Sequence, residues 1–250
     1  RDWVSKGADC LARDEPPCLV NLSDGGKDAV VVREFDLTTR AFIDDGFVLP
    51  EGKHRIEWLD QDTLLVATDF GPGTLTESGY PFIVKTLKRG QTLAQAVEDY
   101  RGAAADGGYG VSPTVYRDKD GQVSAVIITR PLDTFRSETW RLAHDGTTQK
   151  LNLPERVGVS GVIDGRLIFS PDEAWSFDGQ DYPAGSLLAL PLGVLGETRL
   201  DIAIGRDSAL VFAPTARQSL QQVAVLSDSL IAAITDNVAG GLTRFTPGAQ

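Results

Sequence analysis

The stretch that decides the fold is DTLLVATDFGPGTLTESGYPFIVK, residues 62–85. Leu64, Val66 and Thr68 alternate with their neighbours, so they share one face of an extended run. A second alternating run resumes at Phe82, after a crossing rich in glycine, threonine and acidic residues. The pattern predicts a β-hairpin with an oversized loop. Such loops are uncommon in compact β domains and often carry binding or gating roles, so this loop is the first candidate for function.

Extended runs of the same kind recur along the chain and are bounded by turn residues. The expected strands are 19–23, 29–37, 55–59, 63–69, 81–88, 114–117, 123–130, 139–143, 149–153, 157–163, 166–170, 186–191, 200–204, 209–212, 220–226, 230–235 and 242–246. Aspartate–glycine turns separate several of them, at 24–26, 118–121, 145–146, 164–165 and 178–179. One helix is expected, at 92–100, on a connection. The sequence therefore predicts an all-β protein: a sandwich, a barrel or a propeller of four-stranded antiparallel blades.

Six runs of sequence carry a resemblance that separates these architectures. They are REFDL (33–37), LPEGK (49–53), TDFGPGTLTESGYP (68–81), YPAGSLLAL (182–190), FAPTARQSL (212–220) and ITDNVAGGLTRFTPG (234–248). Over most of its length, less so between 101 and 160, the chain resembles the N-terminal β-propeller of bacterial prolyl oligopeptidase-family serine peptidases. The resemblance does not include the catalytic domain of that family.

The resemblance implies a seven-bladed propeller, which needs roughly 40 to 50 residues per blade and therefore more chain than is present. We expect residues 1–250 to be one propeller domain, an incomplete piece of the seven-bladed ring. The α/β-hydrolase catalytic domain is expected to be absent from this chain. The lack of any methionine and the start at Arg1 also suggest a fragment.

The composition limits the partners. A net charge of -11 and an isoelectric point near 4.6 oppose binding to nucleic acid or to an anionic membrane. No apolar run reaches the roughly 18 residues that a membrane span needs. We therefore expect a soluble protein, cytoplasmic or periplasmic. The resemblance implies that its partners are its own hydrolase domain and short peptides.

Cys10 and Cys18 are the only cysteines. Their spacing lacks the C-x-x-C form of a zinc or redox site. The spacing favours two free thiols near a strand, and the alternative is a local disulfide in an exported protein. No metal or other cofactor is expected.

Catalytic motifs are not apparent in the chain. The nearest approach to G-x-S-x-G surrounds Ser160, but the second glycine is missing and the following residues are typical of a strand, not of the helix that the motif requires. His54 and His144 have no neighbouring Ser or Cys partner in a motif and are interpreted as strand or turn residues. The chain by itself is therefore predicted to be inactive.

Two other functions fit the sequence. A five-bladed propeller glycoside hydrolase would use paired carboxylates, for which Asp69, Glu77 and Glu173 are candidates, with Trp175 to stack on a sugar. A non-catalytic binding module would use the loop and exposed aromatic residues such as Trp140.

We interpret the chain as the gating, substrate-selecting propeller of a prolyl oligopeptidase-like serine peptidase that hydrolyses short peptides. The residues expected on the substrate path or at the domain interface are Asp69, Phe70, Glu77, Ser78 and Tyr80.

Overall fold

The computed structural model describes residues 2–12, 15–196 and 209–248. The chain forms two compact units. The first comprises residues 1–115, 126–134 and 142–148, and the second comprises 116–125, 135–141 and 149–250. The expectation that residues 1–250 form a single propeller domain stays a prediction.

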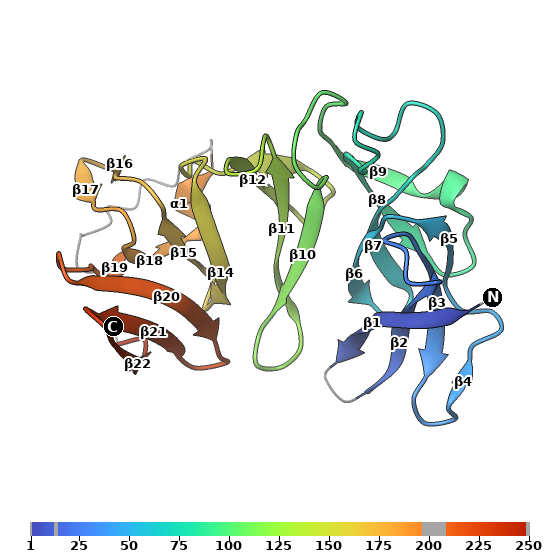
Figure 1. The fold of residues 1–250 in the computed structure, drawn as a ribbon, viewed down its shortest axis with the longest axis horizontal. Coiled ribbons are helices and arrows are strands. Elements are labelled where there is room, and N and C mark those ends of the chain that lie inside the picture. Colours follow the sequence, from blue (N-terminus) through green and yellow to red (C-terminus); the bar gives the residue numbers. More distant parts are fainter. Residues whose placement is uncertain (1, 13–14, 197–208, 249–250) are drawn as a thin grey trace. The chain divides into compact units, whose positions relative to one another are not determined.

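Two antiparallel sheets build most of the first unit, and their strands follow chain order closely (Figure 1). The first sheet contains β1 (Trp3–Ala12), β2 (Glu15–Asp24), β3 (Val30–Asp36) and β4 (Ala41–Phe42), with β5 (Val48–Gly52) paired to β3. The second contains β6 (Arg55–Asp60), β7 (Thr63–Ala67), β8 (Ile83–Lys88) and β9 (Val97–Arg101). The inward residues of both sheets pack into one core with Leu19, Leu49, Leu64 and Trp58 at its centre.

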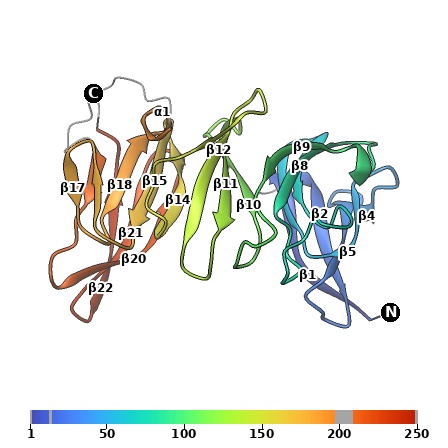
Figure 2. The same ribbon diagram turned by 90° about the horizontal axis from the view of Figure 1, so that it is seen from above.

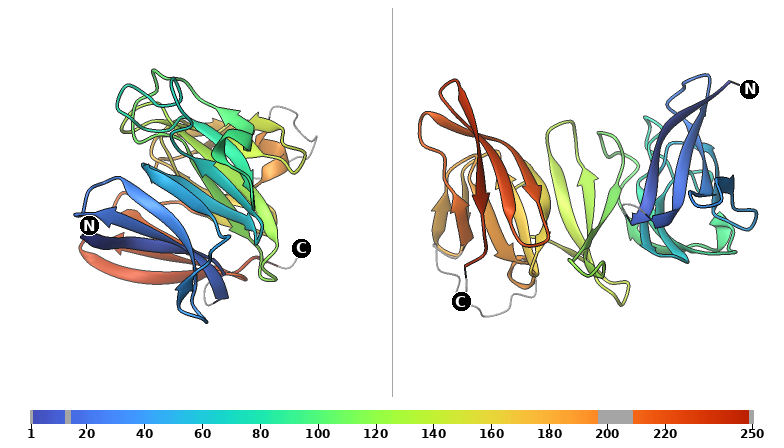
Figure 3. Two further views of the ribbon diagram at one scale, coloured as in Figure 1. Left: turned by 90° about the vertical axis from the view of Figure 1, so that its right-hand side faces the viewer. Right: turned by 90° about the horizontal axis from the view of Figure 1, so that it is seen from below.

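Two antiparallel sheets also build most of the second unit. β14 (Val157–Ile163), β15 (Arg166–Pro171), β18 (Leu187–Pro191) and β19 (Leu210–Phe212) form a four-stranded sheet, three strands of which lie side by side in Figure 2. β20 (Gln218–Val225), β21 (Leu230–Asp236) and β22 (Ala239–Phe245) form a three-stranded sheet, the orange-red end of the chain in Figure 3. Ile168, Leu187 and Leu230 are buried in the core of this unit.

The remaining elements are short or divided between the units. A third four-stranded sheet contains β10 (Ser112–Arg117), β11 (Val123–Pro131), β12 (Ser137–Leu142) and β13 (Thr148–Lys150), with residues in both units. A small hairpin contains β16 (Trp175–Phe177) and β17 (Gln180–Tyr182). A short α-helix, α1 (Leu192–Leu195), directly follows β18.

The predicted fold class is confirmed: the described chain is almost entirely β, and antiparallel four-stranded sheets recur. The turns agree at the level of backbone angles. Asp164 and Gly165 have φ of 48° and 71°, and Asp178 and Gly179 have 55° and 72°, the two positive angles of a tight hairpin turn. The expected strand at 200–204 lies outside the described residues.

The prediction of a helix at 92–100 is wrong. Only Leu93–Gln95 form one turn of 3-10 helix, and Val97–Arg101 continue as β9. β9 pairs with β8, with Ile83 opposite Arg101 and Val84 opposite Tyr100. The ladder with β8 supplies partners for these backbone groups, so sheet pairing overrides the local helical pattern.

Candidate functional site

The loop between β7 and β8 has an ordered first half. The Asp69 carboxylate accepts a hydrogen bond from the Gly71 N–H at 2.8 Å, and Thr74 Oγ1 accepts one from the Phe70 N–H at 3.0 Å. The Thr74 hydroxyl also lies 2.7 Å from the Gly71 carbonyl oxygen. Side-chain oxygens thus satisfy backbone groups that no strand reaches, so this half of the loop has a defined shape.

The second half is a miniature hairpin. Leu75 forms an isolated antiparallel bridge with Pro81, and the Thr76 N–H donates to the Tyr80 carbonyl at 2.8 Å. The Gly79 N–H donates to Thr76 at 2.9 Å and closes the turn. The loop predicted from sequence therefore exists between β7 and β8, and its own hydrogen bonds give it a definite fold.

The five predicted site residues all lie on this loop but face different surroundings. Asp69 is exposed and holds the first turn, whereas Glu77 and Ser78 are exposed at the tip of the second. Phe70 is half-buried, and the Lys85 ammonium lies 4.6 Å from the centre of its ring. Tyr80 is half-buried and turns away from the tip towards a pocket. Whether these residues face a substrate path or another domain stays a prediction.

The pocket beside Tyr80 has a volume of about 470 Å³ and lies within the first unit. Its lining residues come from β1, β2, the turn before β3, the β5–β6 connection, β6, the β7–β8 loop and the start of β10. Its charged lining residues are Lys6, Asp9, Asp28, Lys53, Arg55 and Glu57. No pattern in the sequence indicates this site, because its residues come from separate segments that only the tertiary fold brings together.

Aromatic rings and one lysine form the side of the pocket next to the loop. The Lys53 ammonium lies 3.8 Å from the centre of the Tyr80 ring, a cation–π contact. Tyr109, 62% exposed, meets Tyr80 edge to face with 5.6 Å between ring centres. The loop residue Tyr80 therefore also forms part of the pocket wall.

His54, interpreted from sequence as a strand or turn residue, lines the same pocket and has both ring nitrogens engaged. Nε2 lies 3.0 Å from the Val30 carbonyl and 2.9 Å from that of Pro50, and carbonyl oxygens only accept, so Nε2 carries the proton. Nδ1 then accepts from the Thr68 hydroxyl at 2.7 Å. Burial lowers the pKa of His54 below 6.5, although the hydrogen bonds to the two carbonyls act to raise this pKa. The ring is a neutral brace that ties the start of the loop to β3.

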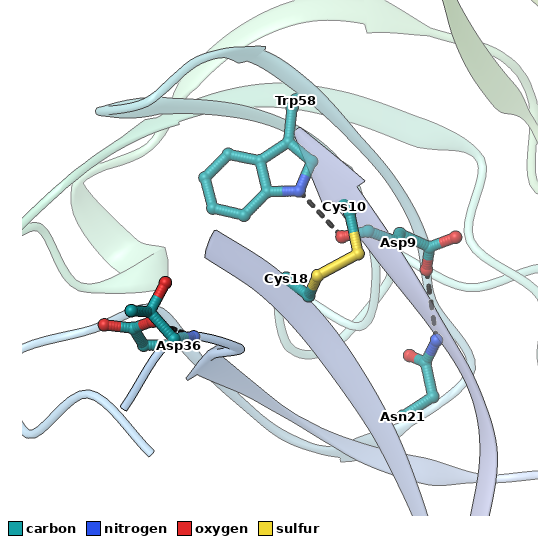
Figure 4. Close-up of a disulfide and its surroundings, with 7 residues drawn as sticks. Asp9, Cys10, Cys18, Asn21, Asp36 and Trp58 are labelled. Carbon is teal, nitrogen blue, oxygen red and sulfur yellow. Dashed lines mark hydrogen bonds between the residues drawn. A yellow bond between two sulfur atoms is a disulfide. The ribbon is translucent and has the colours of Figure 1, made fainter. Parts of the chain in front are cut away.

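The free-thiol interpretation of the cysteines is wrong. Cys10 and Cys18 face each other in the pairing of β1 with β2, their Cα atoms are 4.0 Å apart, and they form a disulfide (Figure 4). The Asp9 carbonyl, next to the disulfide, accepts the Trp58 indole N–H at 2.9 Å. These contacts fix the part of β1 that lines the pocket. The spacing of eight residues gave no sign of the bond because strand register, not sequence distance, brings the two sulfurs together.

The residues of the two alternative functions have ordinary structural surroundings. Glu173 is exposed in a turn, and the Trp175 ring stacks on Phe177 at 5.0 Å between centres, within a cluster of aromatic side chains. Trp140 is half-buried and donates to Glu138 at 3.2 Å. Ser160 lies on β14, which pairs with β15, so the strand predicted around it is confirmed.

Repeated antiparallel sheets, built mostly from strands that are consecutive in the chain, are typical of β-propeller proteins. Comparison with known proteins then specifies which propeller it resembles. An uncharacterized peptidase of Sinorhizobium fredii, y4nA, is 36% identical over 252 residues, which is 99% of this chain and 34% of the relative. An uncharacterized peptidase of Rickettsia prowazekii, RP174, is 25% identical over 245 residues, or 91% of this chain and 32% of the relative.

Solved structures agree on the fold. A post-proline cleaving enzyme from Rickettsia typhi matches with a TM-score of 0.86 at 24% identity, over 99% of this chain and 37% of that one. Oligopeptidase B from Leishmania major matches with a TM-score of 0.68 at 14% identity, over 99% of this chain and 32% of that one. No family model matches the chain. The resemblance to the propeller portion of prolyl oligopeptidase-family peptidases is confirmed, and the chain spans about a third of the length of these relatives.

No helix among the described residues is long and apolar enough to cross a bilayer.

Proposed function

We propose that this chain is the substrate-selecting propeller of a prolyl oligopeptidase-like serine peptidase, and that residues 69–80 face the substrate path or the catalytic domain. The propeller contributes no bond-breaking group. It admits short peptides to a hydrolase domain and excludes larger chains by size, before any chemistry occurs. The proposal places the catalytic serine, acid and histidine in that other domain.

The observation that carries the proposal is the loop itself. Its polar side chains give it a definite fold, and it is anchored to the sheet at His54 and Thr68 and to the pocket at Tyr80. A long loop that keeps its shape can act as a fixed obstacle, whereas a flexible loop would yield to a large substrate. Similarity to peptidases over nearly the whole chain supports peptides as the molecules selected.

The test is a loop replacement in the full-length enzyme. Residues 69–80 are exchanged for a short glycine turn, and kcat/KM is measured on a short and a long peptide with the same cleavage site. We expect the long peptide to gain at least about tenfold relative to the short one, a change of about 1.4 kcal/mol in selectivity. The control replaces the exposed turn 118–121 in the same way. An unchanged ratio in the first variant, or an equal change in the control, contradicts the proposal.

A further inference from the structure

The pocket beside the loop has a charge pattern unlike that of the whole molecule. The chain carries a net charge of -11, yet the pocket is lined by three cationic side chains and three acidic ones, so that its formal charges cancel. A simple anion or a simple cation gains little from such a site, because the lining groups of its own sign repel it. A ligand with one charge of each sign can pair with lining groups of both signs.

Lys53 is the best placed of the three cationic lining residues to bind a ligand. Lys53 is half-buried, and its ammonium is held over the Tyr80 ring at 3.8 Å. The ring face interacts with the charge but accepts no conventional hydrogen bond, so the N–H donors of the ammonium can still bind an acceptor. An ammonium held in this way is a suitable partner for a carboxylate.

Two of the acidic lining residues, Asp9 and Asp28, lie on segments other than the one that carries Lys53. Asp9, on β1, accepts one hydrogen bond from the Asn21 amide at 3.1 Å and keeps further acceptor sites. Asp28 is exposed in the turn that precedes β3. Both carboxylates line the pocket together with Lys53, so an ammonium bound by them and a carboxylate bound by Lys53 would belong to one small ligand.

We propose that this pocket binds a short peptide through its free termini, with the carboxylate at Lys53 and the ammonium at Asp9 and Asp28. Tyr80 and Tyr109 offer ring surface to a side chain or a proline ring between the two ends. The volume of about 470 Å³ lies within the range of small-ligand sites. This inference rests on the proposed function in so far as peptides are the molecules selected. It adds a site where free, already short peptides are retained.

The experiment measures binding to the 250-residue chain by NMR titration, with four forms of the tripeptide Gly-Pro-Ala. One has free termini, one is acetylated, one is amidated, and one is blocked at both ends. We expect each single block to weaken binding about tenfold, the loss that follows from one charge-assisted hydrogen bond, and the double block to weaken it further. Equal dissociation constants for all four forms would overturn the proposal. The absence of any binding of the free form would also overturn it, when the peptide is titrated to about 50 times the concentration that saturates hydrolysis by the full-length enzyme.

Two variants test which pocket residues bind each terminus of the peptide. With Lys53→Met, free and amidated peptides should bind equally, while acetylation still weakens binding. With the double variant D9N/D28N, acetylation should no longer matter, while amidation still does. Lys119→Met and Asp45→Asn, at exposed turns outside the pocket, are the matched controls and should leave all four constants unchanged. Near-ultraviolet circular dichroism verifies that each variant is folded. A Lys53→Met effect that is the same for all four peptides would contradict the assignment.

The outcomes of this test are separate from those of the loop replacement. Binding is measured without hydrolysis, so terminus-dependent binding can fail while residues 69–80 still control peptide length. In the opposite case, the loop replacement leaves selectivity unchanged and the pocket still discriminates free from blocked termini.

Discussion

Glu34 shows how a single buried charge holds parts of the first unit together. Its side chain is 1% exposed, and Arg89 binds it with two hydrogen bonds of 2.8 and 2.9 Å. The Phe47 N–H adds a third at 2.7 Å. Glu34 lies on β3 and Arg89 directly follows β8, so this one ion pair connects the two sheets of the unit. A paired buried charge is costly to disrupt, because the group that remains keeps its desolvation penalty.

Glu34→Gln should therefore destabilise the chain by about 3 kcal/mol, the low end for breaking a buried pair, since Arg89 keeps partial access to water. The measurement is the free energy of unfolding from denaturant titration. Lys27→Met is the control: it breaks the exposed pair with Glu51, 3.6 Å apart, and should cost less than about 1 kcal/mol. Similar losses for both variants would contradict this account of the ion pair.

His54 makes stability depend on pH. Because burial lowers its pKa in the folded state, the unfolded chain takes up a proton first as the pH falls below 6.5. The stability associated with the neutral ring is complete above pH 6.5 and is lost as the pH falls through the folded-state pKa. The loss is about 1.4 kcal/mol for each tenfold difference in proton affinity between the unfolded and the folded chain.

The check is the NMR titration of the His54 ring, with His54→Gln to assign the signal. The titration midpoint should lie below 6.5. Between pH 7 and 5, the free energy of unfolding should decrease less in the variant than in the unaltered chain. A midpoint above 6.5 would show that the carbonyls of Val30 and Pro50 outweigh burial.

At the scale of elements, the hairpin of β1 and β2 depends on a covalent bond as well as on its ladder. The disulfide joins residues eight apart, and Cys18 is buried while β1 is mostly exposed. β1 therefore gains little from burial, so we expect the bond to retain it on the sheet and keep Asp9 in the pocket wall.

The double variant Cys10→Ala/Cys18→Ala should lower the free energy of unfolding by about 2.5 kcal/mol, the loop-entropy value for a loop of this length. Hydrogen exchange should increase first in β1. The control is the unaltered chain with and without a dithiol reductant, which should reproduce the loss. Unchanged stability under reduction would mean that the bond does not form in solution.

At the scale of the whole molecule, the described residues form sheets and connections, and no catalytic constellation is apparent among them. Ser160 lies on β14, at the irregularity between Val159 and Gly161 in the pairing with β15. The Asp145 carboxylate beside His144 binds the Thr147 N–H and hydroxyl at 3.0 and 2.6 Å. These positions have structural explanations that need no reaction chemistry.

The isolated chain should accordingly cleave no peptide. It is incubated with a proline-containing chromogenic peptide and, separately, with a serine-reactive probe followed by mass spectrometry. We expect no hydrolysis above the buffer rate and no added mass. Labelling of any serine would contradict the assignment of catalysis to another domain, and release of sugar from an arabinoside would favour the glycosidase alternative instead.

The sequence by itself determined what depends on neighbouring residues. Alternation placed strands such as 157–163, and aspartate–glycine pairs placed tight turns, because side-chain direction and positive φ are local properties. The loop 69–80 was visible for the same reason: it separates two alternating runs. The similarity to peptidase propellers was likewise readable from short runs of sequence.

Tertiary structure alone decided what depends on residues far apart. Pairing with β8 turned an expected helix into β9, and strand register joined Cys10 to Cys18. Lys53 and Tyr80 meet in one pocket because the connections of two sheets converge there. Such contacts are set by packing and register, which the order of residues along one segment does not contain.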